Sequence, residues 1–386
     1  MYLFVSKKNE ILLCEEFSSI IANALDIKIH GVFTKFVQLF EYLLELAKTR
    51  HFTLIIDEFQ EFIVINNSIY SDLQNLWDEY KDKTTMNLVL SGSIYSLMKK
   101  IFEDKKEPLF NRADSKIHLK PFSTNTIKEI LLDNYPQYTK ENLLSFYTLT
   151  GGVAKYVELF VLHKAFTLSQ QLDLILEENS LFLEEGKNIL IEEFGKEYTT
   201  YFSILSLISS GKTSRAEIQS ILDKDIGGYL DRLEKEYSII KRIKPIFAKK
   251  DGRILKYEII DNFFSFWFRF IYKYKSAIEI ENFAYVKEIV RRDFQTYSGK
   301  FLEKYFIEKL KLTYRYSSIG TYWERGNKNE IDIVALNEEE QTMFIVEVKI
   351  NPQKISLVKL EEKAQKIIQK FQKYKISFKG YSLEDM

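Results

Sequence analysis

The sequence has few of the residues that build disulfide-linked, zinc-binding or fibrous proteins. Only one of its 386 residues is a cysteine, Cys14, which excludes an internal disulfide and a Cys-x-x-Cys site. The four histidines are scattered, which disfavours a zinc site. Five prolines and fourteen glycines are too few for collagen-like or low-complexity chains. These absences indicate a globular protein of a reducing compartment.

Long apolar runs and an excess of one charge are also missing. The most aromatic stretch, 263–274, is interrupted by Arg269 and is shorter than the ~20 residues that span a bilayer. The opening residues, MYLFVSKKNEILL, lack the apolar core of a signal peptide. Lys plus Arg and Asp plus Glu both number 55, which argues against a surface uniformly charged for nucleic acid. We therefore expect a cytoplasmic protein with no membrane partner.

Enough apolar residues are present for several cores. Hydrophobic residues make up 46% of the chain, and its length predicts two to three domains at roughly 150 residues each. Up to residue 122, short apolar runs alternate with helical stretches, a pattern typical of a parallel sheet covered by helices on both faces. The expected strands are YLFVS, FTLIIDEF, LVLSGS and IHLKPF. A helical pattern then continues to residue 194.

The rest of the chain contains two further patterns. Three short helical stretches from 198 precede two strand-like runs around Lys-Lys-Asp-Gly, an order typical of a winged helix. A second mixed segment follows after residue 291. In it we expect helix 299–312, strands 331–336 and 343–350, and helix 357–374.

Two adjacent carboxylates end the second expected strand. Asp57 and Glu58 follow the apolar run Leu54-Ile55-Ile56, as in the Walker B motif of P-loop ATPases. There the first acid holds Mg²⁺ through water, and the second can polarise the attacking water. A strand that simply enters a polar loop is the alternative explanation.

Three polar residues downstream fit the same chemistry. Ser91 and Ser93 end the next apolar strand, where they could sense γ-phosphate or water. Arg112 stands where an arginine finger could stabilise developing phosphate charge. Alternatively, the serines only cap a helix and Arg112 lies on a solvated surface.

Taken in order, these segments resemble a known family. LIIDEFQ, LVLSGS, PLFNRADSKIHLKPF and Leu149-Thr150-Gly151-Gly152-Val153-Ala154-Lys155-Tyr156 are similar to the archaeal-type P-loop ATPases, which stand near the AAA and STAND groups. The resemblance continues through a winged helix and the C-terminal domain that commonly follows in this family. It implies ATP and Mg²⁺ as cofactors, a helical lid, and ATP-dependent action on DNA.

One motif of that family is missing. The phosphate-binding loop G-x-x-x-x-G-K-[ST] is absent, because Gly211-Lys212-Thr213 has Ser206 in place of the first glycine and lies between two expected helices. The strand beginning at Met1 matches the one that follows this loop in the family. We therefore expect the chain as written to bind ATP poorly or not at all. Either the true start codon lies upstream, or the gene is a decayed or truncated copy. We also expect the loss to leave strand edges unpaired.

The expected hairpin of the winged helix is strongly basic. Residues 241–256 contain seven basic residues and one acidic residue, Asp251. The preceding helix, GGYLDRLEKEY, carries Asp231, Glu234 and Glu236. A basic wing favours phosphate contacts, but an acidic third helix is a poor surface for reading bases. DNA binding and protein binding both remain open. The basic residues are Lys241, Arg242, Lys244, Lys249, Lys250, Arg253 and Lys256.

The last two expected strands contain a second acidic pattern. Folding them into a hairpin brings Asp332 near Glu347, and period-two alternation places Glu347 and Lys349 on one face. Two converging carboxylates and a lysine resemble the PD-(D/E)XK nuclease core. Asp332 and Glu347 would hold Mg²⁺ and Lys349 would orient the attacking water, while Glu303 matches the acid that often completes such a site. The alternative is a nuclease-like scaffold without turnover.

The predicted fold is α/β. A parallel-sheet P-loop NTPase-like core without its P-loop strand carries a helical lid, a winged helix and a C-terminal α/β nuclease-like domain. The predicted function is that of an archaeal-type ATPase coupled to DNA binding and a Mg²⁺-dependent nuclease, in a chain that could form a homo-oligomer. The alternative is a non-catalytic DNA- or protein-binding module. The predicted domains are 1–122 (core), 123–195 (lid), 196–275 (winged helix), 276–295 (linker helix) and 296–386 (nuclease-like).

Overall fold

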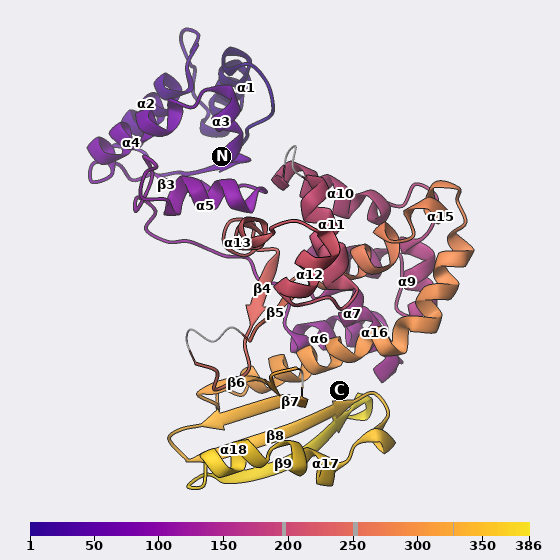
Figure 1. The fold of residues 1–386 in the computed structure, drawn as a ribbon. Coiled ribbons are helices and arrows are strands. Elements are labelled where there is room, and N and C mark those ends of the chain that lie inside the picture. The colour runs from indigo at the N-terminus through magenta and orange to yellow at the C-terminus, as the bar shows by residue number, and fades with distance from the viewer. Residues whose placement is uncertain (195–197, 250–253, 327) are drawn as a thin grey trace. The chain divides into compact units, whose positions relative to one another are not determined.

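The chain folds into two compact units. The structure, a computed structural model, describes residues 1–194, 198–249, 254–326 and 328–386 (Figure 1). The N-terminal unit is Met1–His118 and the C-terminal unit is Leu119–Met386. Their boundary lies close to the predicted end of the ATPase core at 122. The other predicted boundaries stay predictions.

A three-stranded parallel sheet forms the centre of the N-terminal unit. Its strands are β1 (Tyr2–Phe4), β2 (Thr53–Asp57) and β3 (Asn87–Leu90), with β2 in the middle. Leu3, Leu54 and Ile56 are buried against helices whose apolar residues recur at helical spacing. The helices are α1 (Glu10–Leu25), α2 (Phe36–Leu46), the 3-10 turn η1 (Phe59–Glu61), α3 (Phe62–Ile65), α4 (Ile69–Tyr80) and α5 (Tyr95–Glu103).

Two expectations for this sheet are wrong. Helices do not cover both of its faces, because Tyr2, Phe4 and Val89 are 52%, 46% and 41% exposed. The run IHLKPF, residues 117–122, is not a strand, and Ile117 and Leu119 in it are 85% and 91% exposed. A strand needs a hydrogen-bonding neighbour, and in the described residues the sheet ends at β3, with no strand between β3 and this run.

The helical pattern from 124 to 194 is confirmed in the C-terminal unit. Thr139 and Thr167 form capping boxes at the starts of α7 and α9, and Gly151 ends α7 in the left-handed region. These caps explain why the sequence breaks into helices at these points. The helices are α6 (Thr124–Asn134), α7 (Lys140–Thr150), α8 (Ala154–Leu162), α9 (Leu168–Ile175) and α10 (Leu181–Phe194).

Three helices and a pair of antiparallel strands follow, as expected. The tripeptide Gly211-Lys212-Thr213 forms the turn between the first two helices, so its rejection as a nucleotide site agrees with the structure. The strands are shorter than expected, and residues 244–255 connect them; Lys250, Asp251 and Arg253 lie outside the described residues. The elements are α11 (Tyr198–Ser209), α12 (Arg215–Leu222), α13 (Gly227–Lys235), β4 (Ile240–Ile243) and β5 (Lys256–Ile259).

One long helix leads into the last part of the chain. α16 (Phe283–Lys311) runs unbroken through Gly299, so the expected division into a linker helix and a separate helix from 299 is wrong. Apolar residues along its length pack in the core of the unit, which outweighs the low helix propensity of one glycine. Before it lie α14 (Asn262–Phe266), the π-helix η3 (Trp267–Tyr272) and α15 (Lys275–Glu279).

A four-stranded mixed sheet ends the chain. Strands β6 (Ser318–Glu324), β7 (Lys328–Asn337) and β8 (Thr342–Lys349) are antiparallel neighbours, and β9 (Lys375–Ser382) is parallel to β8. The expected strand pair is thus confirmed, whereas β6 and β9 were not expected. The expected helix 357–374 is two shorter helices, α17 (Leu357–Lys363) and α18 (Gln365–Lys370). The 3-10 turns η4 (Pro352–Lys354) and η5 (Leu383–Asp385) complete the chain.

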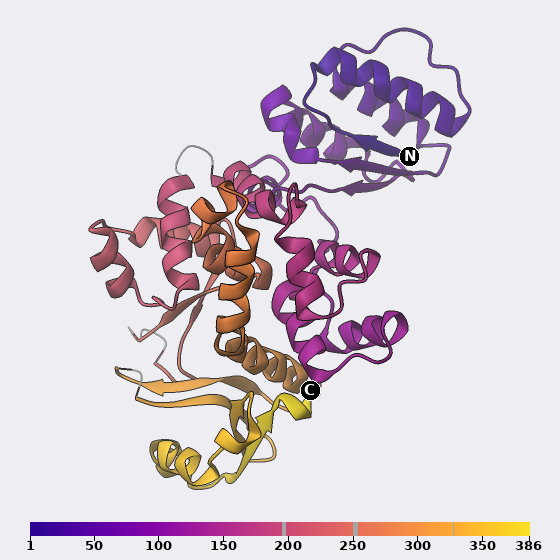
Figure 2. The same cartoon turned by 90° about the vertical axis from the view of Figure 1, so that its right-hand side faces the viewer.

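The two faces of this sheet pack against different helices. Val346 and Val348 share a core with α16 and the helices before it, while Met343 and Ile345 pack with Leu360 of α17. Figure 1 and Figure 2 show α16 across one face and α17 with α18 across the other. Because side chains alternate along a strand, Glu347 and Lys349 of β8 lie on the face of α17.

Candidate functional site

The carboxylate of Asp57 ends the central strand of the N-terminal unit. Its Oδ2 accepts a hydrogen bond from the Tyr2 hydroxyl (2.6 Å), and its Oδ1 accepts one from the Ser91 hydroxyl (2.7 Å). The backbone N–H of Glu58 donates to the same Oδ1 (3.0 Å). Above all the Tyr2 hydroxyl, and then that of Ser91, lower the pKa of Asp57, so the group is an anion at neutral pH.

Glu58 adopts a left-handed backbone, with φ of 54°, and its side chain is held beside Asp57. Its Oε2 accepts hydrogen bonds from the Ser93 hydroxyl (2.8 Å) and from Nε2 of Gln60 (2.5 Å). Gln60 is fully buried, and its amide oxygen fills the space that a Cβ on Gly92 would need. The structure therefore brings four predicted residues together: Asp57, Glu58, Ser91 and Ser93.

Arg112 lies elsewhere in the N-terminal unit. Its Nε and Nη2 donate to the carboxylate of Asp78 at 3.0 and 2.7 Å, and its Nη1 donates to the carbonyl oxygen of Pro108 (2.7 Å). Within the described residues, it makes no hydrogen bond or ion pair with Asp57 or Glu58. The structure therefore places Arg112 in a local ion pair.

Most described basic residues of the β4–β5 segment are also paired within the chain. Lys241 lies 3.1 Å from Glu258, and Lys256 lies 2.8 Å from Glu330. Arg242 pairs with Asp231 and Glu234 of α13. Two of the acids that make α13 a poor surface for base readout thus pair with one basic residue of the hairpin, Arg242. Lys244 and Lys249 are exposed, and Lys250 and Arg253 lie outside the described residues.

Asp332 is placed by an irregularity in β7. Gly320 of β6 lies opposite Val334, but Tyr322 lies opposite Ile331, so β7 carries one extra residue in the bulge that contains Asp332. The regular pairing of β7 with β8 ends at Ile333 and Val346, and Asp332 is the next residue of β7. Its Oδ2 accepts a hydrogen bond from the backbone N–H of Val348 (2.7 Å). The bulge thus directs this carboxylate toward the end of β8.

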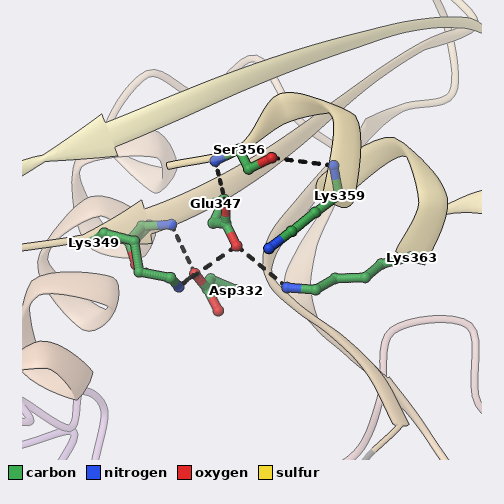
Figure 3. Close-up of polar contacts among 7 residues, drawn as sticks. Asp332, Glu347, Lys349, Ser356, Lys359 and Lys363 are labelled. Carbon is green, nitrogen blue, oxygen red and sulfur yellow. Dashed lines mark hydrogen bonds and ion pairs between the residues drawn. The ribbon is translucent and has the colours of Figure 1, made fainter. Parts of the chain in front are cut away.

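Lys349 joins the two predicted acids. Its Nζ lies 3.0 Å from Oδ2 of Asp332 and 3.8 Å from Oε1 of Glu347 (Figure 3). Burial acts to lower the pKa of Lys349, but the charge of Asp332 acts to raise it. The resulting pKa is above the ordinary value, so the amine is a cation. The predicted convergence of these three side chains is present in the structure.

Glu347 has two further partners from the segment after β8. Its Oε2 accepts a hydrogen bond from the backbone N–H of Ser356 (3.0 Å), and its Oε1 lies 3.2 Å from Nζ of Lys363 (Figure 3). Burial acts to raise its pKa, but the Ser356 hydrogen bond and the two lysines lower it below the ordinary value. Sequence reasoning missed Ser356 and Lys363, although Lys363 belongs to a regular series of lysines.

Glu303 faces the site from α16. Burial first, and then the charge of Asp332, raise its pKa to about 8. In the described residues it makes no hydrogen bond or ion pair with Asp332, Glu347 or Lys349. Nor do those residues contain any group of three or more His, Cys, Asp or Glu side chains that could hold a metal ion. Two carboxylates, Asp332 and Glu347, therefore form the core of this site.

Known proteins share both halves of this architecture. Residues 4–160 match a family model described as an ATPase domain predominantly from Archaea, and residues 267–368 match one described as Archaea bacterial proteins of unknown function. Uncharacterized protein MJECL04 of Methanocaldococcus jannaschii is 32% identical over 306 residues, covering 77% of this chain and 67% of that protein.

Solved structures support the fold. The Walker-type ATPase PABY2304 of Pyrococcus abyssi aligns with a TM-score of 0.51 at 16% identity, covering 69% of this chain and 83% of that one. A mutant RuvB of Thermotoga maritima aligns at 14% identity, covering 66% of this chain and 83% of that one. Its TM-score of 0.29 is too low to indicate a shared fold.

The fold and the Asp57–Glu58 strand end define a protein with a Walker-type ATPase fold. More narrowly, the chain belongs to the archaeal-type ATPase family, with the archaeal ATPase domain followed by the domain of unknown function. Among the described residues, every helix is too short or too polar to span a bilayer.

Proposed function

We propose that this archaeal-type ATPase carries a C-terminal Mg²⁺-dependent nuclease of the PD-(D/E)XK kind that cleaves DNA. The observation that carries the proposal is the meeting of Asp332, in the bulge of β7, with Glu347 and Lys349 at the end of β8. A lysine held between two carboxylates provides both a place for a divalent cation and a fixed positive charge for phosphate.

The side chains present fit a Mg²⁺ ion. Burial first, and then the charge of Asp332, raise the pKa of Glu303, and a bound cation would offset the repulsion between these two carboxyl groups. Mg²⁺ commonly uses one or two protein carboxylates and keeps several waters, so Asp332 and Glu347 suffice as ligands. When bound, the ion would polarise the scissile phosphate and lower the pKa of a bound water.

The residues of the chain would divide the remaining work. Lys349 would orient the attacking water or stabilise charge on the phosphate, since its ammonium is already fixed by Asp332. Lys363 would leave Glu347 when a cation takes that carboxylate. The freed amine could then bind a phosphate oxygen.

In the N-terminal unit we assign the family's ATPase roles to the cluster at the end of β2, with poor ATP binding by the chain as written because it lacks the phosphate-binding loop. Asp57 would hold Mg²⁺ through water, and Glu58 would polarise the water that attacks ATP. Ser91 and Ser93, which hydrogen-bond these two carboxylates, would sense the γ-phosphate.

The segment from α11 to β5 would contribute a winged helix. Three helices followed by an antiparallel hairpin have the order of that motif, and Lys241, Lys244 and Lys249 of the hairpin segment are exposed. The wing would contact DNA phosphates, because Arg242 and the acids of α13 are engaged with each other.

The nuclease assignment predicts loss of cleavage on removal of the site. The purified chain, incubated with plasmid and with linear DNA, should cut in Mg²⁺ and not in EDTA. Glu347→Ala and Lys349→Ala should each slow cutting by at least about 100-fold, because the metal ligand or the phosphate-stabilising charge is gone. Rates come from gel assays under single-turnover conditions.

Glu338→Gln, on the exposed turn between the same two strands, is the matched control and should cut at the wild-type rate. Circular dichroism melts show whether each variant is folded. Mg²⁺-dependent cutting that survives both site substitutions contradicts the assignment.

A second candidate function is a DNA- or protein-binding module without turnover. It is favoured by one observation: each carboxylate already has a lysine partner, Lys349 for Asp332 and Lys363 for Glu347, as in a structural ion-pair network. A folded wild-type chain that binds DNA but never cuts it in Mg²⁺ or Mn²⁺ would favour this candidate.

A further inference from the structure

Lysines recur along one side of helices α17 and α18. Lys359, Lys363, Lys366 and Lys370 follow at intervals of three or four residues, the spacing that aligns side chains on one helix face. We call these four residues the lysine row. Each directly precedes a residue that packs in the core under the sheet: Leu360, Ala364, Ile367 and Phe371. The row therefore borders the packed side of the two helices.

The contacts of the row show which parts of the unit it joins. At its start, Lys359 points toward Glu347, and Lys363 forms an ion pair with that residue (Figure 3). Lys366 forms an ion pair with Glu324 of β6. Lys370 lies 5.4 Å from the ring centre of Phe247, in the connection between β4 and β5. The row thus extends from the carboxylate site, past β6, to the hairpin segment.

The β4–β5 connection is anchored beside the far end of the row. The backbone N–H of Ile246 donates to the carbonyl oxygen of Thr321 on β6 (2.7 Å). The rings of Phe247 and Phe371 lie 4.6 Å apart, centre to centre. These contacts hold Ile246 beside β6 and Phe247 beside α18, and the exposed Lys244 and Lys249 each lie two residues away along the chain.

The charge and the length of this surface fit a polyanion. Residues 357–375 contain six lysines and two glutamates in a chain with no net charge. The row spans eleven residue steps over two helices that meet at Ala364, or at most about 16 Å at 1.5 Å per helical residue. That length equals about five base steps of a DNA strand at 3.4 Å each. A surface of this kind attracts regularly spaced phosphates and orients them along its axis.

We propose that the lysine row is a phosphate-tracking surface that leads duplex DNA from the described part of the β4–β5 connection, at Phe247, to the Asp332–Glu347–Lys349 site. The proposal rests on the proposed nuclease function and extends it, since it names the surface that delivers the substrate. Its lysines contact phosphates and not bases, so binding through it is independent of DNA sequence and weakens with salt.

Binding of a fluorescent 20-base-pair duplex to the full chain tests the proposal. Measurements are made in EDTA, so that no cutting occurs, over a series of KCl concentrations. The triple variant Lys359→Gln, Lys366→Gln, Lys370→Gln should raise Kd at least about tenfold at 0.1 M KCl. It should also reduce the slope of log K against log salt by about 2 to 3, because three phosphate contacts are lost.

A matched triple variant loses the same charge elsewhere. Lys83→Gln, Lys187→Gln, Lys275→Gln removes three exposed lysines, each paired with one glutamate, and should bind like the wild type. Unchanged affinity and salt slope in the row variant, or an equal loss in the matched variant, overturns the proposal. Thermal melts confirm that both variants fold.

The same variants separate this proposal from the proposed nuclease function. If the row variant loses binding while the wild type never cuts, the surface stands and the nuclease fails. If the wild type cuts and the row variant binds and cuts normally, the nuclease stands and the surface fails. Phosphatidylserine vesicles test a lipid surface: vesicle binding that depends on the row, with unchanged DNA binding, overturns the proposal.

Discussion

At the C-terminal site, Glu303 contributes a carboxyl group whose protonation depends on its neighbours. Burial, followed by the charge of Asp332, raises its pKa from the ordinary 4.5 to about 8. The folded chain therefore binds a proton that the unfolded chain releases between these two pH values. The stability tied to this proton is present at low pH and is lost as pH rises through about 8.

This shift predicts a pH-dependent effect of Glu303→Gln. Near pH 5 both side chains are neutral, so the two proteins should have similar melting temperatures. Toward pH 9 the wild type must bury a charge and glutamine need not, so the variant should gain melting temperature relative to the wild type. Calorimetry at intervals across this range measures the difference.

The same amide change on an exposed turn, Glu338→Gln, is the control for that series. A constant difference between Glu303→Gln and the wild type from pH 5 to 9 would contradict the raised pKa. If Mg²⁺ binds nearby, its addition should reduce the difference at high pH, because a cation favours the charged carboxylate.

Individual site residues were predictable to the extent that they follow local pattern. Asp57 and Glu58 stand directly after an apolar run, and Glu347 and Lys349 alternate along a strand. Strand geometry was therefore enough to predict that these residues belong to candidate sites. Tyr2 and Lys363 were missed because they reach the carboxylates from other elements. The direction of the Asp332 side chain depends on a bulge, and no feature of the sequence marks where β7 takes an extra residue.

At the scale of elements, the joint between α7 and α8 depends on a glycine. Gly152 has φ of 81°, and a Cβ there would lie 2.3 Å from the carbonyl oxygen of Phe122. The N–H of Phe122 donates to the Gly152 carbonyl oxygen (2.7 Å), so the two backbones are held at this distance. The Leu149-Thr150-Gly151-Gly152 segment thus holds Phe122, near the start of the C-terminal unit, against the joint between α7 and α8.

Gly152→Ala should therefore destabilise the protein. An alanine forced into the left-handed backbone conformation, with its Cβ against a carbonyl oxygen, should lower the free energy of unfolding by about 2 to 4 kcal/mol. Gly299→Ala is the matched control, because a Cβ there meets no atom within 4 Å and the residue is inside a helix. It should raise stability by about 0.5 to 1 kcal/mol. Chemical denaturation measures both; equal effects would contradict the close approach.

Elements were predicted well where periodicity decides and poorly where packing decides. The helical character of residues 124–194 was predicted from periodicity, but the helix starts at Thr139 and Thr167 were not. The expected helix begins at Gly299, but Tyr297 and Phe301 on either side of this residue are buried and α16 continues through it. Residues 117–122 have a strand-like composition, yet a strand also needs a neighbour, which composition does not describe.

At the scale of the whole molecule, the hydrophobic cores separate differently from the predicted domains. One core lies in the N-terminal unit, around Phe17, Phe36 and Phe59. In the C-terminal unit one core continues from the α6–α10 helices through α11–α14 to α16 and the face of the sheet that α16 covers, and a separate core around Leu360 lies between the other face and α17 with α18. The sequence has no linkers to show this, because which helix faces share a core depends on their packing.

Separate cores predict separate unfolding transitions. Scanning calorimetry of the full chain should show one transition for each unit, because each buries its own apolar residues. Phe17→Ala should lower the first unit's transition, since emptying a fully buried phenylalanine site costs about 3 to 5 kcal/mol. Phe160→Ala should lower only the other transition, for the same reason in the other core. A single transition that both substitutions shift equally would mean that the two units unfold as one, against the division of the core residues.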